Sequence, residues 1–364
     1  MSIIIFIILL AVLILVHEFG HFIIAKLSGI RVDEFGLGFP PKIFSFKYGE
    51  TKYSLNLIPF GGFVKIFGED PNEESIRGKD SKRSFVKKSK WIQVAVLIAG
   101  VSFNVIFAWL LISVGYMSGL PSSVGEFNAG VVRDAHVVVT SVQPNSPALE
   151  SGLKSGDALL FMESQRGDVI QNFSVEDVQQ FIGSHGDEEI TILYKRGNDT
   201  ATIKVRPSYE LLPGKPAIGI AMDYIGFAKL PFFRAFYEGA KLTIGLTKAV
   251  AVGLGNFIFE AFTGRAELSQ VTGPVGIAGL VGDATKLGII YLLSFAAFIS
   301  INLAVINLMP FPALDGGRIL FVLIETVIRR PIPPKIANAF NTVGFLLLIG
   351  LMLLVTYQDI LKLF

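Results

Sequence analysis

Long apolar stretches separated by polar segments dominate the pattern of this chain. Four of them are predicted to form membrane-spanning helices, at residues 2–27, 91–117, 287–308 and 336–357. Each can cross a hydrocarbon core of about 30 Å at a rise of about 1.5 Å per residue. The first has no basic segment before it and no small-residue cleavage site after it, so we interpret it as a retained helix rather than a signal peptide. The pattern therefore predicts a polytopic α-helical membrane protein with four transmembrane helices.

The loop that follows the first apolar stretch, residues 31–68, has a different pattern. Apolar and polar residues alternate over 42–47 and 52–58, and Gly49-Glu50 separates the two segments. This arrangement predicts a β-hairpin. Unpaired strand edges are costly in lipid but tolerated where they line a protein cavity, and an edge can capture an extended peptide. We expect a membrane-associated β-hairpin, with an ordinary cytoplasmic hairpin as the alternative.

A compact α/β module is predicted over residues 130–207. It contains a strand at 137–142, a helix at 175–182 and a strand at 189–194. The order Ser-Pro-Ala, Gly-Leu and Gly-Asp within 146–157 resembles a PDZ domain of the type found in bacterial membrane-associated proteases. The sequence holds one copy of this pattern, so we expect one inserted PDZ-like domain.

Composition and charge agree with a membrane protein that carries one soluble portion. Hydrophobic residues make up 51% and charged residues 17% of the chain, whereas soluble proteins have about 25% charged residues. The net charge of +2 gives no reason to expect nucleic acid. Lys and Arg number 13 over residues 26–90 but 14 over the much longer segment 117–286. The first loop is therefore expected to be cytoplasmic and the middle segment external.

The histidines are the first candidates for chemistry. The chain has no cysteine, so a tightly bound metal must use His, Asp or Glu, and the four histidines are His17, His21, His136 and His185. His17 and His21 lie one helical turn apart, so both imidazoles can reach one ion. With Glu18 they form the pattern in which two histidines bind zinc and the glutamate acts as general base. A polar cluster that packs helices without metal is the alternative.

A hydrolytic zinc usually has three protein ligands and one open position. The two remaining histidines lie in the predicted external module, so a carboxylate must supply the third ligand. Asp315 lies in the segment 307–317, where two prolines break the third apolar stretch and two glycines allow close backbone approach. The alternative is that Asp315 only caps a helix over 318–328.

A fifth apolar stretch, residues 242–262, is interrupted by three polar residues. Whether it crosses the membrane determines on which side Asp315 lies. If this stretch crossed the membrane, Asp315 would lie on the opposite side from His17 and His21. We therefore expect 232–262 to form an amphipathic helix on the outer membrane surface. The expected organisation comprises helices 1 and 2 with the hairpin, the PDZ-like domain, a membrane-surface segment, and helices 3 and 4, at residues 1–117, 130–207, 231–284 and 287–364.

Together these motifs closely resemble the site-2 protease family of intramembrane metalloproteases, nearest to the bacterial regulator-of-sigma-E type. The residues that carry the resemblance are His17-Glu18-Phe19-Gly20-His21, Gly61-Gly62-Phe63, Gly100 to Asn104, Thr272 to Ala278 and Asn307 to Gly317. The resemblance implies a Zn2+ ion bound by His17, His21 and Asp315, with Glu18 as the catalytic base. It also implies that Asn104 helps to hold the substrate or the tetrahedral intermediate. A buried amide that bridges helices is the alternative for Asn104.

The resemblance implies a zinc-dependent intramembrane endopeptidase of the inner (plasma) membrane. Its expected substrates are transmembrane segments of single-span membrane proteins, such as anti-sigma factors or signal-peptide remnants, cut in regulated intramembrane proteolysis. The active site is expected toward the cytoplasmic side and the PDZ-like domain outside. That domain is expected to screen substrates by size or by a newly exposed peptide C-terminus.

Three other functions fit parts of the pattern. A membrane zinc protease of another kind would take its third ligand from Glu325, so the zinc content of Asp315→Ala and Glu325→Ala separates the two. An inactive PDZ-bearing membrane scaffold predicts that Glu18→Gln changes nothing. A metal transporter would need a polar path across the outer half of the spans, and the sequence contains none.

Overall fold

The structure is a computed structural model, and it describes residues 2–69, 73–127, 131–171, 173–197, 199–212, 214–265, 271–330 and 332–361. The predicted domain limits at residues 1, 130 and 364 lie outside this set. Contacts divide the chain into two units. The helical unit comprises Met1–Ser113, Phe236–Thr285 and Leu292–Phe364, and the sheet unit comprises Val114–Ala235 and Lys286–Tyr291.

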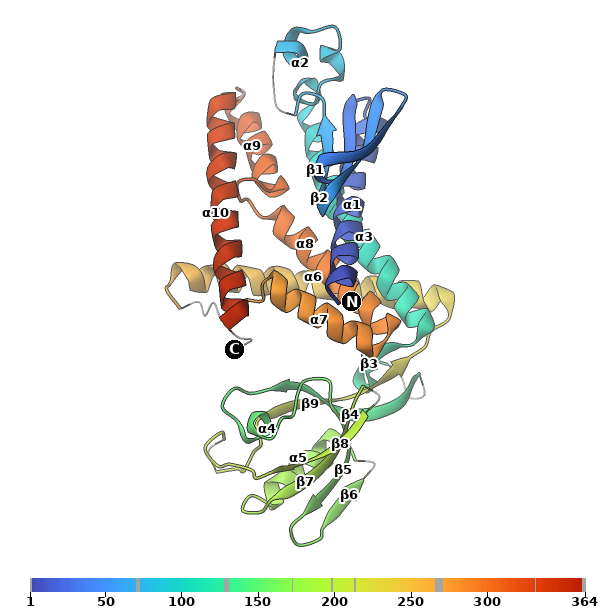
Figure 1. Ribbon diagram of the computed structural model, residues 1–364, viewed down its shortest axis with the longest axis vertical. Coiled ribbons are helices and arrows are strands. Elements are labelled where there is room, and N and C mark those ends of the chain that lie inside the picture. Colours follow the sequence, from blue (N-terminus) through green and yellow to red (C-terminus); the bar gives the residue numbers. More distant parts are fainter. Residues whose placement is uncertain are drawn as a thin grey trace. The chain divides into compact units, whose positions relative to one another are not determined.

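Long α-helices form most of the helical unit (Figure 1). Five helices among the described residues are long and apolar enough to cross a membrane, namely α1 (Ser2–Leu27), α3 (Lys90–Ser118), α6 (Phe232–Phe262), α8 (Ile289–Leu308) and α10 (Pro334–Leu361). Four of them match the predicted spans to within a few residues at each end. A set of several long apolar helices is typical of a membrane protein, as the sequence predicts.

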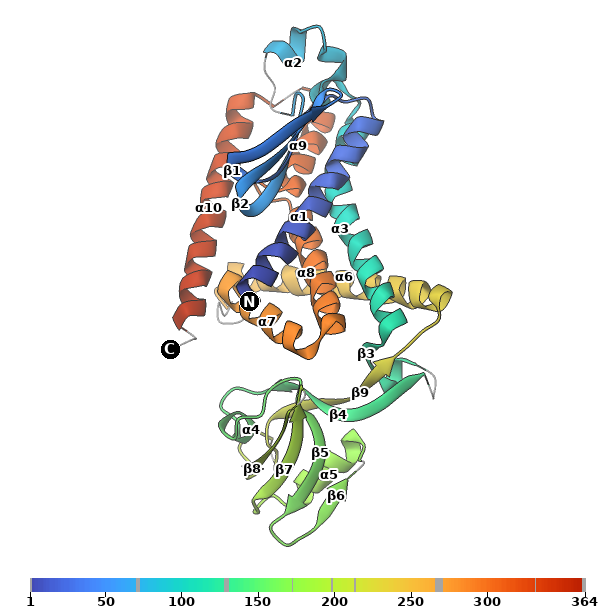
Figure 2. The same ribbon diagram turned by 45° about the vertical axis from the view of Figure 1, so that its right-hand side comes forward.

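The additional candidate is α6, which the sequence predicts to lie on the membrane surface. The helix forms at the predicted residues, and length and composition also qualify it as a span. The count of four spans therefore stays a prediction. In both views α6 lies crosswise to α10 (Figures 1 and 2).

The third apolar stretch is interrupted where its prolines predict a break. After α8 ends at Leu308, six residues separate it from α9 (Asp315–Ile328), and Ala313 adopts a left-handed φ of 69°. The helix thus begins at Asp315, three residues earlier than the sequence indicates. Asp315 occupies its first turn, where a carboxylate interacts favourably with the helix dipole.

The motif at residues 272–278 forms the start of α7 (Pro274–Leu287). Asp359 on α10 is buried and accepts hydrogen bonds from the backbone N–H groups of Gly273 and Gly276, at 3.1 and 2.8 Å. A Cβ atom on Gly273 would come within 2.8 Å of Asp359 Oδ2. The glycine is therefore needed for α10 to cap α7.

The segment predicted as a hairpin contains two antiparallel strands, β1 (Val32–Tyr48) and β2 (Thr51–Ile66). Its association with the membrane stays a prediction. Glu50 in the turn accepts hydrogen bonds from Arg83 Nη2 and Lys26 Nζ, both at 2.7 Å. These cations lower the pKa of Glu50 to about 2, with Arg83 contributing most. The turn is therefore tied to α1 and to the following loop at physiological pH.

The pairing within the hairpin is more complex than two simple strands. Gly36 on β1 is aligned with Ser54 on one side and with Phe63 on the other. The first part of β1 therefore lies between two parts of β2, and residues 62–65 form an outer strand of the small sheet. A Cβ atom on Gly36 would collide with the Phe63 ring, so this packing requires glycine.

A mixed α/β fold makes up the sheet unit. Its strands are β3 (Leu120–Ser123), β4 (Val132–Val142), β5 (Ala158–Ser164), β6 (Val169–Gln171), β7 (Ile190–Arg196), β8 (Asp199–Val205) and β9 (Ile220–Ala228). The sheet order is β3-β9-β4-β5-β7-β8, and β6 pairs with β5. The helices α4 (Pro147–Glu150) and α5 (Val175–Ser184) complete it. Apolar residues of the central strands and α5, such as Val139, Met162 and Val178, form its core.

Strand β9 lies beyond the expected end of this module at residue 207, and it pairs with β4 along most of the length of β4. The sequence pattern does not reveal it because β9 contains Gly226 and Asp223 among its apolar residues. The module is thus completed by a strand that is distant in sequence from its partner.

Candidate metal centre

Helix α1 places His17 and His21 on one face, against α3. Both side chains are buried, with 7% of each residue exposed. Two glycines make the approach of the helices possible. A Cβ atom on Gly20 would come within 2.5 Å of the Ala99 carbonyl oxygen, and one on Gly100 would overlap the rings of both histidines. Small residues at helix interfaces allow this kind of close contact.

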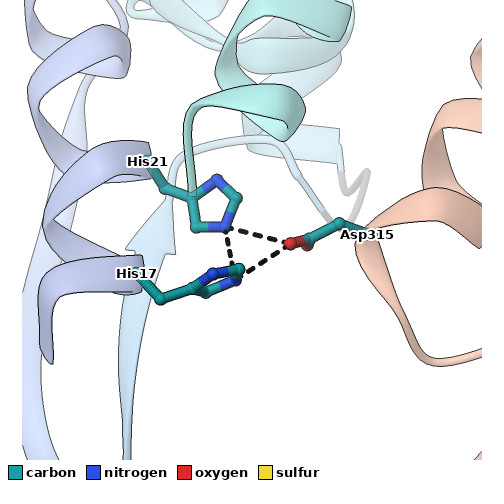
Figure 3. Close-up of side chains that lie close together, drawn as sticks. All are labelled: His17, His21 and Asp315. Carbon is teal, nitrogen blue, oxygen red and sulfur yellow. Dashed lines mark hydrogen bonds and ion pairs between the residues drawn. The ribbon is translucent and has the colours of Figure 1, made fainter. Parts of the chain in front are cut away.

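Asp315 reaches the two histidines from the start of α9 (Figure 3). Its Oδ2 atom lies 3.0 Å from His17 Nε2 and 3.3 Å from His21 Nε2, and the two Nε2 atoms are 3.2 Å apart. The three side chains come from segments about 300 residues apart in the chain, as the separation of 298 between His17 and Asp315 shows. The predicted grouping of these residues is therefore present in the structure.

Contacts behind the cluster hold the two imidazoles in place. His21 Nδ1 lies 2.8 Å from the Val96 carbonyl oxygen, to which it donates a hydrogen bond. The side-chain amide nitrogen of Asn104 lies 3.3 Å from His17 Nδ1. Asn104 is fully buried, and its Oδ1 atom has no hydrogen-bond partner among the described residues. Val96, which the sequence gives no reason to single out, thus orients one ring.

A cavity of about 220 Å³ adjoins the cluster. It is lined by the three clustered residues, by Glu18, by Phe63, Val64 and Ile66 of β2, and by Glu69 and Arg318. Gly62 lies close to Glu18, since a Cβ atom there would be 3.4 Å from Glu18 Cγ. The cavity therefore brings together the Glu18 carboxylate, three groups of a kind suited to a metal ion and one edge of the β-sheet.

The other candidates from the sequence lie elsewhere. Glu325 forms an ion pair with Lys90 and accepts a hydrogen bond from the backbone N–H of Ile332, so it is not part of the described cluster. His185 belongs to the sheet unit, where its Nε2 atom lies 3.0 Å from Asp168 Oδ2. Within the described residues, the group suited to a metal ion is His17, His21 and Asp315.

Comparison with known proteins decides the family. The profile of peptidase family M50 matches residues 5–351. The chain belongs to peptidase family M50. The predicted assignment to the site-2 protease family, and with it the prediction of a zinc-dependent metalloendopeptidase, is confirmed at the level of the family.

Relatives of this M50 peptidase match over nearly the whole chain. A protein of Clostridium perfringens, provisionally named a zinc metalloprotease, is 40% identical over 96% of this chain and 95% of its own length. The regulator of sigma-W protease RasP of Bacillus subtilis is 30% identical over 100% of this chain and 99% of its own length. The zinc metalloprotease RasP of Bacillus licheniformis is 29% identical over 100% and 99%.

Among the solved structures with a similar part, one example covers about a quarter of this M50 peptidase. It is the PDZ domain of an SdrC-like protein from Listeria monocytogenes, with 27% identity over 24% of this chain and 86% of that chain, and a TM-score of 0.21. A score this low does not establish a shared fold. The PDZ-like description of the sheet unit therefore rests on the order of the sequence motifs within residues 146–157.

The close packing of α1 on α3 leads to a prediction. We expect Gly100→Ala to force the histidine rings apart, because the added Cβ atom would lie within 2.8 Å of Cε1 of both. Displacements of about 1 Å cost roughly 10²-fold in rate, so metal content and peptidase activity of the purified protein should both fall. Gly253→Ala on α6 is the matched control, since a Cβ atom there meets nothing within 4 Å. Wild-type activity in Gly100→Ala would contradict this account.

Proposed function

We propose that this M50 peptidase cleaves transmembrane segments of single-span membrane proteins, with zinc held by His17, His21 and Asp315 and with Glu18 as general base. The observation that carries the proposal is the convergence of these three ligand groups within 4.8 Å of one another, beside a cavity that contains Glu18. Anti-sigma factors or signal-peptide remnants are the proposed substrate class. The name of the sigma-W regulator from Bacillus subtilis supports a role in signalling.

The donor set fits zinc in chemistry and in spacing. Two imidazole nitrogens and one carboxylate oxygen are the three protein ligands of many hydrolytic zinc sites. Tetrahedral bonds of about 2.0–2.1 Å place ligand atoms about 3.3 Å apart, and the three donor atoms here are separated by 3.0, 3.2 and 3.3 Å. The Val96 carbonyl keeps the proton of His21 on Nδ1 and leaves the Nε2 lone pair facing the cluster.

Asn104 is proposed to orient His17. Binding of metal through Nε2 requires the proton of His17 on Nδ1, and the amide of Asn104 then turns its oxygen to accept that proton. This role differs from the contact with substrate that the family resemblance implies. The complete burial of Asn104 next to His17 supports it.

In the proposed reaction Glu18 accepts a proton from the attacking water and returns it to the nitrogen of the leaving amine. A bound zinc ion supplies Lewis acidity, polarising the scissile carbonyl and making water a better nucleophile at neutral pH. His17, His21 and Asp315 would hold the ion, and with it the positive charge, at a fixed position. The cavity beside them admits only a short stretch of chain, so a helical substrate has to unwind locally before its carbonyl can reach this position.

Strand β2 is proposed to hold the unwound substrate. Residues 62–65 form an outer strand of the small sheet, and Phe63 and Val64 line the cavity. An extended peptide can add to such an edge through main-chain hydrogen bonds. Exposed apolar side chains on the hairpin, including Phe44, Phe46 and Leu57, support its predicted association with the membrane.

We further propose four spans, with the active site toward the cytoplasm and the PDZ-like domain outside. The density of Lys and Arg in the first loop supports this orientation. Helix α6 would then lie at the outer surface, as its direction crosswise to α10 suggests (Figure 2). The lipid bilayer is accordingly a partner of the whole helical unit.

The sheet unit is proposed to screen substrates, either by size or by their C-termini. A groove of about 1150 Å³ lies between α5 and β9, lined among others by Gln179, Gly183 and Ile220. Strand β3 pairs only with residues 225–228 of β9. The preceding part of that edge has no described strand beside it and could accept a peptide strand.

Cleavage by the purified protein tests the proposed function. A single-span test substrate in detergent or liposomes should yield two fragments, and mass spectrometry should place the cut inside its apolar segment. Removal of metal with a chelator should stop cleavage, and added zinc should restore it. Cleavage that survives complete removal of metal, or a cut outside the apolar segment, would contradict the proposal. An inactive scaffold predicts no fragments at all.

A further inference from the structure

Two charged side chains in the cavity have no part in the reaction outlined above. Arg318 and Glu69 both line it, and Arg318 Nη1 forms an ion pair with Glu69 Oε1. Their side chains are only 35% and 18% exposed. Partly buried charged groups are costly unless they are paired, so such pairs usually have a structural or functional role. The pair therefore requires an explanation in terms of the site.

Arg318 lies on the same helix, α9, as Asp315 of the candidate metal centre. It lies three residues after Asp315, so the two side chains project from neighbouring positions on the same helix. The segment before Asp315 is not helical, and α9 is held elsewhere by the ion pair of Glu325 with Lys90 near its far end. The ion pair of Arg318 is thus a second anchor of α9, in the same turn as the proposed ligand.

Glu69 is attached to the substrate-binding edge. It lies three residues after the end of β2, in a turn closed by a hydrogen bond of 3.2 Å from its backbone N–H to the Ile66 carbonyl. Phe67 in the same turn donates a backbone hydrogen bond of 2.9 Å to Arg31, whose guanidinium also lies 3.6 Å above the Phe67 ring. Phe85 donates a third, of 2.8 Å, to Phe67. The turn that carries Glu69 is therefore held in place by several contacts at the end of β2.

We propose that the ion pair of Arg318 with Glu69 sets the distance between the β2 edge and Asp315, and that Arg318 is a positioning residue for the reaction. This inference rests on the proposed function. A peptide paired with β2 moves with that strand, so the pair determines whether the scissile carbonyl arrives at the metal. Main-chain pairing with β2 does not require the ion pair, so loss of the pair should slow turnover much more than it weakens binding.

The test uses the purified full-length protein and the single-span substrate. Glu69→Gln and Arg318→Gln each remove one partner, and the double variant Glu69→Arg/Arg318→Glu reverses the pair. We expect each single variant to lower kcat by roughly 10- to 100-fold, with KM changed by less than about 3-fold and zinc content unchanged. The reversed pair should recover at least half of the loss on a logarithmic scale. Lys90→Gln, which breaks the other ion pair of α9, is the matched control and should keep kcat near wild type.

Three outcomes would overturn the inference. They are wild-type kcat in both single variants, a reversed pair no faster than the single variants, and loss of zinc in Arg318→Gln, which would assign Arg318 to the metal centre instead. A single variant that does not accumulate in the membrane is judged by the reversed pair, which must accumulate and cleave. If the wild type and Glu18→Gln gave equal cleavage, the proposed function would fail. Wild-type cleavage lost in Glu18→Gln but kept in Arg318→Gln would refute only the positioning role.

Discussion

Replacing Glu18 with glutamine should abolish cleavage while zinc remains bound. Glutamine has nearly the same shape as glutamate but cannot accept a proton from water, and general base catalysis contributes about 10²–10⁴-fold in rate. Glu18 lines the cavity but is not among the three grouped ligands, so the metal should not depend on it. Co-expression with a tagged single-span substrate, followed by metal analysis of the purified variant, measures both effects.

Glu73→Gln is the control for the loss of a carboxylate, since Glu73 is exposed at the start of α2 (Glu73–Arg77), away from the cavity. It should cleave as the wild type does. Equal cleavage by the wild type and by Glu18→Gln would mean that another protease cuts the substrate or that Glu18 is not the base. Loss of zinc in Glu18→Gln would assign Glu18 to the ligands and remove it from the proton transfer.

Features that depend on local sequence could be predicted. Helix α1 forms over the residues that its hydropathy indicates, and the four-residue spacing of His17 and His21 places both on one face. The break before Asp315 follows from the prolines, because proline lacks the backbone N–H that a helix interior needs. Each of these inferences uses only neighbouring residues and the geometry of one helix.

Features that depend on packing between distant segments could not be predicted. The sequence does not indicate that Gly36 lies between Ser54 and Phe63, since the alternation of residues only predicts strands and not their partners. Nor does it indicate that Arg318 meets Glu69. Such pairs depend on how α9 and β2 pack together, and many other pairings of the same charged residues are compatible with the sequence.

Helix α6 shows a different limit of sequence reasoning. A stretch of this length and hydropathy satisfies the criterion for a span, but an amphipathic helix at the interface satisfies it too. A surface position for α6 is instead expected from the chemistry of the site, because Asp315 must reach His17 and His21 from the same side of the membrane. In the structure Asp315 contacts both histidines, so the three residues have to lie on the same side of the membrane.

Replacing Asp315 with alanine should remove zinc and, with it, all cleavage. Two imidazoles alone leave the ion with one protein ligand fewer than hydrolytic sites usually have, so zinc should fall from about one per chain to near zero in the purified protein. Glu325→Ala is the matched control on the same helix: its carboxylate contacts Lys90 and the Ile332 N–H rather than the cluster, and zinc should stay bound. The reverse result, with zinc retained in Asp315→Ala and lost in Glu325→Ala, would identify the other kind of membrane zinc protease. Retention in both would show that neither carboxylate binds the ion, and the grouping of Asp315 with His17 and His21 would then have to be explained as an ion pair that packs α9 against α1.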